Sequence, residues 1–91
     1  MPKALVLIDI GLYSAEEVLR ELRACKEIKE AFIVTGVYDV VAKVEAASFD
    51  DLVGIIARHI KRLYQVQELL FMLIVESKEI EKEQENEAIL V

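Results

Sequence analysis

The sequence lacks the residues that several common classes of protein require. It holds a single cysteine, Cys25, so no disulfide can form within the chain, and its one histidine leaves no Cys/His spacing typical of a metal site. The longest apolar run, Leu69 to Val75, has seven residues, whereas a transmembrane helix needs about 20. No signal peptide is evident, because Met1-Pro2-Lys3 leads directly into a strand-like run. We therefore expect a cytoplasmic protein in which Cys25 is an inert, partly buried thiol.

Basic residues are also scarce. Eleven Lys and Arg stand against 17 Asp and Glu, which gives a net charge of −6. Nucleic-acid binding needs clustered Lys and Arg, so this balance argues against a nucleic-acid partner. The 91 residues make one domain without room for a second core, yet 55% of them are hydrophobic. A chain this small usually buries such an excess of apolar surface in an oligomer interface.

The first part of the chain has the pattern of strand, helix and strand. Residues 3–10 are rich in Val, Ile and Leu and predict a strand buried on both faces. A capping box of Ser14 and Glu17 begins a predicted helix over 14–25. Residues 28–36 then predict a second strand.

The second part repeats this pattern after a tight turn at Gly36. Residues 38–46 alternate in polarity and predict a strand that forms an antiparallel hairpin with the one before it. A helix over 48–63 begins with an acidic variant of the same cap at Ser48. Its apolar stripe consists of Phe49, Leu52, Val53, Ile56, Ile60 and Leu63. The apolar residues 66–76 predict the last strand.

The two parts look like one β-α-β unit used twice. In both helices the apolar residues stand at the same three offsets from the capping serine. The order β-α-β-β-α-β predicts an α+β, ferredoxin-like domain over residues 1–76, with two helices on one face of a four-stranded antiparallel sheet. Residues 77–91 form a charged C-terminal extension. It is either a solvated or frayed helix, or a tail whose apolar end, Ala88–Val91, docks on a neighbouring copy.

The second face of this sheet also requires a partner. A sheet covered on one side should alternate apolar with polar residues, but the first and last strands are apolar on both faces. Two helices can cover only one face. The simplest cover for the other is the same sheet of a second copy, so we expect dimerisation through the sheet face.

Few residues suggest catalysis. His59 lies slightly off the apolar stripe of its helix, which favours a partly exposed structural role over proton transfer. Asp9, at the end of the first strand, faces solvent, a partner or an interface. The sequence has no phosphate loop, no nucleophile elbow and no paired-carboxylate spacing. We therefore expect no enzyme and no cofactor.

The stretch 35-TGVYD-39 has two interpretations. Gly36 suits a position of positive φ, and Asp39 can bond the backbone of the turn, which together describe a simple turn. The same turn offers backbone N–H groups, a carboxylate and a phenol at one end of the sheet. An amino acid needs an acceptor for its ammonium group and donors for its carboxylate, so the turn can also hold such a ligand.

The surrounding sequence resembles a known family. The runs 31-AFIVTGVYDVVAKVEAASFDDL-52 and 16-EEVLRELRACKEIKEAF-32 are similar to the effector domain of the Lrp/AsnC transcriptional regulators, also called the RAM (regulation of amino acid metabolism) domain. The resemblance covers residues 3–76. Because the chain starts at the first strand, it resembles a stand-alone RAM domain that lacks the helix-turn-helix of the regulators.

The resemblance implies a mode of assembly and a ligand site. Relatives form dimers by packing their sheets, and the dimers assemble into rings, commonly octamers or decamers. Amino-acid effectors lie between dimers, beside the turn and the last strand of a neighbouring dimer. Carried over by motif, the expected ligand-binding residues from the turn are Gly36, Val37, Tyr38 and Asp39.

The last strand departs from the family pattern. Many relatives have Pro-Gly-Val followed by two threonines, whereas this chain reads 64-YQVQELLF-71. Leu69 and Phe71 stand where the threonines would be, and they complete the expected set of ligand-binding residues. Their side chains leave half of the expected pocket apolar, which favours a hydrophobic amino acid or a pocket that has lost its function.

The resemblance and the patterns together favour a non-enzymatic, amino-acid-binding oligomeric module, which modulates a full-length Lrp/AsnC regulator. Two alternatives remain. One is a structural or assembly module with a degenerate pocket, supported by Leu69 and Phe71. The other is a small dimeric α+β barrel enzyme, which would need His59 or Asp9 to line a cavity.

Overall fold

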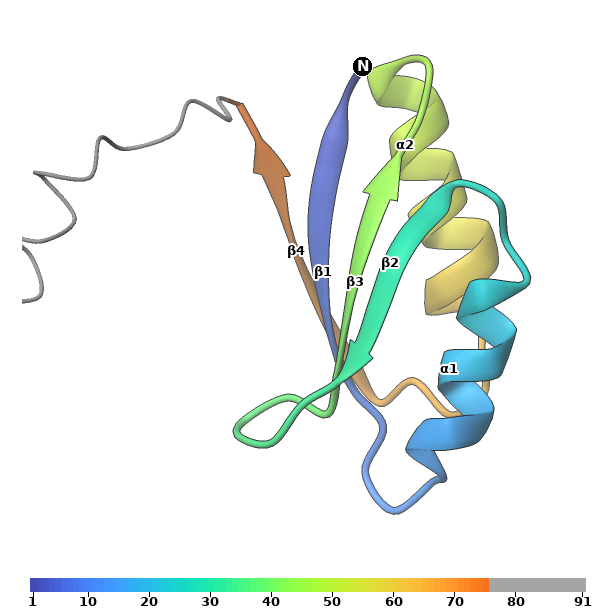
Figure 1. Ribbon diagram of the computed structural model, residues 1–91, viewed down its shortest axis with the longest axis vertical. Coiled ribbons are helices and arrows are strands. Elements are labelled where there is room, and N and C mark those ends of the chain that lie inside the picture. Colours follow the sequence, from blue (N-terminus) through green and yellow to red (C-terminus); the bar gives the residue numbers. More distant parts are fainter. Residues whose placement is uncertain (76–91) are drawn as a thin grey trace, which may run out of the picture.

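A computed structural model of the protein describes residues 1–75, so the predicted extension over 77–91 lies outside the described residues. The predicted β-α-β-β-α-β order is confirmed (Figure 1). The strands are β1 (Lys3–Asp9), β2 (Ile28–Ile33), β3 (Val40–Glu45) and β4 (Glu68–Ile74). The helices are α1 (Ala15–Arg23) and α2 (Phe49–Ile55), the latter continued by the π-helix η1 (Ile56–Lys61).

The four strands form one antiparallel sheet in the order β2-β3-β1-β4. Both helices lie on the same side of it, as Figure 1 shows. This order is the ferredoxin-like arrangement that the repeated β-α-β pattern predicts. β1 is a central strand and pairs with both β3 and β4, whereas β2 and β4 are the edges.

Both helices begin at the predicted serine caps. The Ser14 hydroxyl accepts a hydrogen bond from the backbone N–H of Glu17 at 3.4 Å, and the Ser48 hydroxyl accepts one from Asp51 at 3.1 Å. Each bond satisfies one of the donors that the first turn of a helix leaves without a partner.

The second helix differs from the prediction in its last part. Residues 56–61 wind as a π-helix, which the helical pattern did not indicate. Leu52, Ile56 and Ile60 of the predicted stripe are buried, but Phe49 and Val53 are exposed. Val53 faces a groove above β4 that the helix does not close, and this explains its exposure.

The core lies between the helices and one face of the sheet. Along β1 the side chains alternate, so that Ala4, Val6 and Ile8 are fully buried under the helices. β3 contributes its own alternate residues to the same core, and α1 adds Val18 and Leu22.

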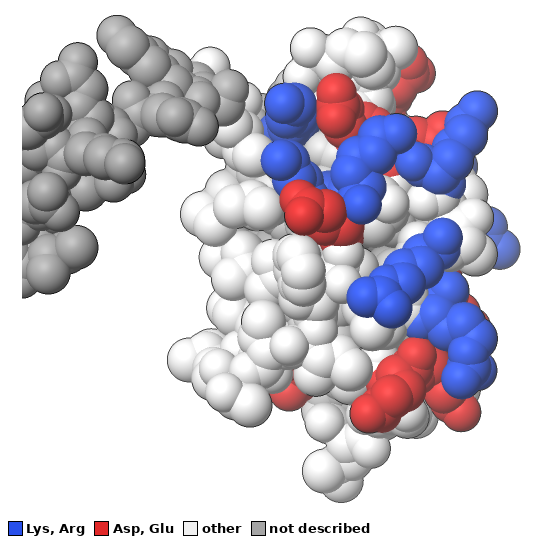
Figure 2. Space-filling model, in the orientation of Figure 1, with Lys and Arg blue, Asp and Glu red and all other residues white. Residues whose placement is uncertain are grey.

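The other face of the sheet has no cover within the described residues. It carries contiguous apolar side chains that pair across the strands. These open-face residues are Leu5, Leu7, Phe32, Val41, Leu70 and Met72. Leu70 and Met72 are each 48% exposed. In Figure 2 a broad uncharged area covers the left part of the view, over the region of β4 and β1.

Candidate ligand-binding site at the end of the sheet

The connection between β2 and β3 is a loop of residues 34–39, wider than the predicted tight turn. Both flanking strands are shorter than predicted, and the loop is closed by a bond from the N–H of Val34 to the carbonyl of Asp39 at 2.8 Å. Gly36 has a φ of +143°, which confirms the predicted positive φ. A Cβ atom there would meet nothing within 4 Å, so the backbone conformation, not space, requires glycine.

Asp39 fixes the loop to the neighbouring strand. Its N–H donates to the carbonyl of Ile8 at 2.9 Å, and its Oδ2 atom accepts from the N–H of Ile10 at 2.9 Å. Asp39 therefore continues the β1–β3 pairing beyond Val40, the first residue of β3. One oxygen of its carboxylate bonds the backbone after β1 and not the backbone of its own turn, so the prediction that Asp39 bonds the turn is wrong.

Further acidic residues lie at the same end of the sheet. The Oδ1 atom of Asp9 accepts from the N–H of Gly11 at 2.9 Å, in the turn where Gly11 has a φ of +59°. Asp9 pairs in register with Glu68 at the start of β4. Asp39, Asp9 and Glu68 thus bring three carboxylates to the ends of three adjacent strands. The family pattern did not indicate that Asp9 and Glu68 lie at the same end of the sheet as Asp39.

The loop also presents unused donors. The backbone N–H groups of residues 35–38 form no hydrogen bond with any other residue of 1–75. Val37 is 87% exposed, and Tyr38 and Asp39 are half-buried. This end of the sheet therefore combines free backbone donors with carboxylates, which is the polarity that a zwitterion requires.

Leu69 and Phe71 lie elsewhere in the same chain. Their register partners are Ile8 and Val6, so both project from the helix side of β4. There they line a groove of about 410 Å³ together with Val53, Ile56 and Ala57. One chain therefore does not bring Leu69 and Phe71 to the loop that carries Gly36, Val37, Tyr38 and Asp39.

One polar side chain is buried without a partner for its oxygen. Gln65, between η1 and β4, is 1% exposed, and its Oε1 atom accepts no hydrogen bond from the described residues. Two residues further on, the backbone N–H of Gln67 donates to the carbonyl of Asp9 at 2.7 Å. The sequence pattern did not indicate the burial of Gln65.

The residues considered for catalysis do not lie together in one site. His59 is exposed on η1 and lines grooves on the helix layer, whereas Asp9 bonds the turn after β1. Cys25 is half-buried and its thiol donates to Glu27 Oε1 at 3.3 Å. Burial, and then the Glu27 carboxylate, raise the pKa of this thiol, so it stays protonated and poorly nucleophilic. Among residues 1–75 no three His, Cys, Asp or Glu side chains are grouped as a metal site requires.

The comparison with protein families decides the identity of this fold. The family described as "Lrp/AsnC ligand binding domain" matches residues 3–83. The chain belongs to this family. The match covers all four strands and both helices, and it extends beyond residue 76, where the sequence pattern placed the end of the domain.

Two solved structures share the fold of this chain at more than 30% identity. The crystal structure of FFRP-DM1 shares 32% identity and a TM-score of 0.79, with 82% of this chain and all of that chain covered. The hypothetical protein PHS023 from Pyrococcus horikoshii shares 31% identity and a TM-score of 0.78, over 85% of this chain and 93% of the other.

More distant structures share the fold. Escherichia coli AsnC has 21% identity and a TM-score of 0.76, and the match covers 89% of this chain but 55% of AsnC. No curated protein matches significantly. The Lrp/AsnC ligand binding domain is a regulatory family and not an enzymatic one. Within residues 1–75 no helix is long and apolar enough to cross a membrane.

Proposed function

We propose that this protein is a non-enzymatic regulatory module of the Lrp/AsnC type that binds an amino acid beside the loop 34–39. The observation that carries the proposal is the combination at the end of the sheet. Four free backbone N–H groups stand in the loop, next to the carboxylate of Asp39. A cytoplasmic site of action fits such a module.

The carboxylates supply the ammonium half of the site. Asp39 uses Oδ2 to hold Ile10, and its Oδ1 atom accepts no bond from residues 1–75. Asp9 and Glu68 add negative charge from the neighbouring strands. An ammonium group placed here forms charge-assisted hydrogen bonds, which are about twice as strong as neutral ones.

The loop supplies the carboxylate half. The N–H groups of Gly36, Val37 and Tyr38 are exposed or half-exposed at the loop and have no internal partner among residues 1–75. Successive backbone N–H groups in a turn form a concave site for an anion. The positive φ of Gly36 gives this turn its shape.

The side chain of the ligand requires a second copy. Leu69 and Phe71 line a separate groove within one chain, so they reach a bound amino acid only from a neighbouring subunit. In that arrangement the site prefers a hydrophobic amino acid, because two apolar side chains face the ligand where hydroxyls would otherwise be. Leu69 and Phe71 remain part of the proposed site on this basis.

The assembly that brings the copies together begins with the open face of the sheet. We infer a dimer formed by two such faces, since half-buried apolar side chains of β1 pair with exposed apolar side chains of β4. The dimers then form an octamer or decamer. Mixed rings with a full-length Lrp/AsnC regulator would let the module alter that regulator's response.

Calorimetric titration with each of the twenty amino acids tests the ligand site. We expect heat from one or a few hydrophobic amino acids, and loss of that heat in Asp39→Asn. This variant keeps an oxygen acceptor for Ile10 and removes the charge that binds the ammonium group. Asp50→Asn, which removes a charge from the first turn of α2, should bind as the wild type does. Silence from all twenty with an intact oligomer would overturn the proposal.

Leu69 and Phe71 also favour a second candidate function. They replace the polar residues of many relatives, so the chain can be a structural member of a mixed assembly without a ligand of its own. This candidate predicts an oligomer that stays unchanged, in size and stability, when amino acids are added. An amino-acid-dependent shift in melting temperature would exclude it.

A further inference from the structure

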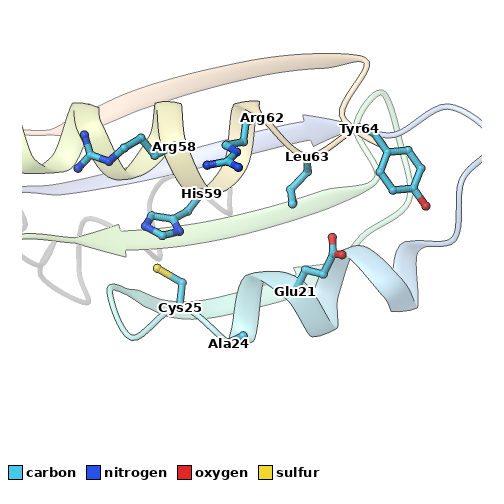
Figure 3. Close-up of a pocket in the computed structure, with 8 residues that line it drawn as sticks. All are labelled: Glu21, Ala24, Cys25, Arg58, His59, Arg62, Leu63 and Tyr64. Atoms are coloured by element: carbon cyan, nitrogen blue, oxygen red, sulfur yellow. The ribbon is translucent and has the colours of Figure 1, made fainter.

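A second groove lies in the helix layer, away from the end of the sheet. It has a volume of about 570 Å³ and runs between η1 and the C-terminal end of α1. Figure 3 shows its two walls, with Arg62, His59 and Leu63 on the η1 side and Glu21, Ala24 and Cys25 on the α1 side. Tyr64 stands at one end. Pockets that hold small organic ligands have volumes of this order.

The η1 wall is rich in cationic residues. The run 58-RHIKR-62 contains four basic side chains around Ile60, which is buried in the core. Arg58, His59 and Arg62 line this groove, whereas Lys61 lines the groove above β4. Arg58 and Arg62 are four positions apart, so they lie on the same side of the helix. A chain with a net charge of −6 thus concentrates positive charge at one place.

Arg58 and Arg62 form no ion pair within the part of the chain that the structure describes. The ion pairs within residues 1–75 join Lys26 to Glu27 and Lys43 to Glu30, and neither includes Arg58 or Arg62. No hydrogen bond to residues 1–75 engages the guanidinium groups of Arg58 and Arg62 or the ring of His59. The Arg58 guanidinium lies against Gly54, one turn earlier in the helix, so Arg58 stands at the edge of the groove.

The other residues of the groove limit the kind of ligand that it can hold. Tyr64 packs edge-to-face on Tyr13, with ring centroids 5.3 Å apart, so one end of the groove is a fixed aromatic surface. Ala24, Leu63 and the protonated thiol of Cys25 add apolar surface. Glu21 is the acidic group on the α1 wall, and Glu27 lies near His59 on the loop beyond it.

We propose that this groove binds a small organic molecule through an oxyanion, a phosphate or carboxylate group held by Arg62 and His59 with Arg58 at the edge. Guanidinium groups bind such oxyanions in bidentate fashion, which a scattered positive surface does not. The apolar surface of Leu63 and Tyr64 takes the remainder of the molecule. The site is independent of the proposed amino-acid site, because no residue lines both.

Titration with inorganic pyrophosphate, followed by ¹H–¹⁵N NMR at constant low ionic strength, tests the groove. We expect chemical-shift changes at Arg58, His59, Arg62 and Cys25. In Arg62→Gln the dissociation constant should be about tenfold higher, since a charge-assisted contact is lost. Lys29→Gln removes the same charge from an exposed position outside the groove and should bind as the wild type does. Glu21→Gln should bind more tightly, because it removes the opposing carboxylate.

Each outcome either supports or overturns the proposed oxyanion site in the groove. Specific shifts with the predicted ranking of Arg62→Gln, Lys29→Gln and Glu21→Gln support a metabolite site. Equal weakening in Arg62→Gln and Lys29→Gln, or no binding by the wild type, overturns the proposal.

Discussion

The carboxylate of Asp39 accepts a hydrogen bond at 2.9 Å from the backbone N–H of Ile10, which lies 29 positions earlier in the sequence. This bond joins the loop after β2 to the end of β1. The residue of the family motif that we assign to the ligand is therefore also a structural residue. A test of Asp39 must therefore distinguish its proposed contact with the ligand from its hydrogen bond to Ile10.

Replacement of Asp39 should therefore depend on what replaces it. Asp39→Ala leaves the N–H of Ile10 without its acceptor and should lower the free energy of unfolding by about 1–2 kcal/mol. Asp39→Asn keeps an oxygen in place and should cost less. Urea unfolding measures both. Equal destabilisation by the two variants would show that charge, and not the hydrogen bond, holds the loop.

Gly36→Ala should destabilise the loop through backbone strain alone. The φ of +143° is unfavourable for any residue with a Cβ atom, although the added methyl group would meet no atom within 4 Å. We expect a loss of about 1–2 kcal/mol in the free energy of unfolding. Thermal unfolding of Gly36→Ala should be measured beside that of Gly54→Ala. In that variant the added methyl group displaces only the end of the Arg58 side chain, and the helix gains propensity. A neutral Gly36→Ala would mean that the loop relaxes to another conformation.

A charge on the open face should dissociate the dimer. Leu7 lies between Val41 and Leu70 in the register, so Leu7→Glu places a carboxylate at the centre of the proposed interface. Light scattering after size exclusion should report a smaller assembly, while circular dichroism shows an intact fold. Leu12→Glu changes an exposed residue of the turn before α1 and serves as the control. An unchanged mass in Leu7→Glu would exclude this face as the interface.

The reactivity of Cys25 should begin only at high pH. Burial first, and then the hydrogen bond to Glu27, raise the pKa of the thiol above its ordinary value. The rate of alkylation by iodoacetamide should rise with a midpoint above that of a free cysteine. In Glu27→Gln the midpoint should move down, because one of the raising causes is removed.

The raised pKa of Cys25 also determines how the stability of the fold changes with pH. A thiol whose pKa is higher in the folded state stabilises the fold below the ordinary thiol pKa, and this contribution is lost as the pH rises through the folded value. Cys25→Ser should therefore flatten the alkaline part of the stability profile. A midpoint at or below that of free cysteine would contradict the assignment.

The fold could be predicted because its signals are local and repeated. Ser14 and Ser48 cap their helices as the sequence indicates, and alternation along β1 and β3 identifies the buried face. Strand ends were less accurate. The predicted strands end at Gly36 and begin at Tyr38, but the register of β2 and β3 stops at the Ile33–Val40 pair.

The site could be predicted only in part, because its contacts are long-range. Gly36 carries a local signal of turn chemistry, so its positive φ was foreseeable. The bond of Asp39 to Ile10 and the pairing of Asp9 with Glu68 depend on how β1 lies in the sheet. The π-helix over 56–61 and the burial of Gln65 are set by tertiary packing, which the 3.6-residue pattern does not encode.

The position of β1 in the sheet also determines when the domain can complete its fold. β1 is the first strand to leave the ribosome, yet its Lys3 pairs with Glu45 on one side and with Ile74 on the other. The pairing of β1 with β4 is therefore formed last. Contacts of such long sequence separation slow folding. A nascent chain that ends before β4 exposes an unpaired, apolar strand edge, and this makes stalled or truncated products a target for aggregation and for chaperones.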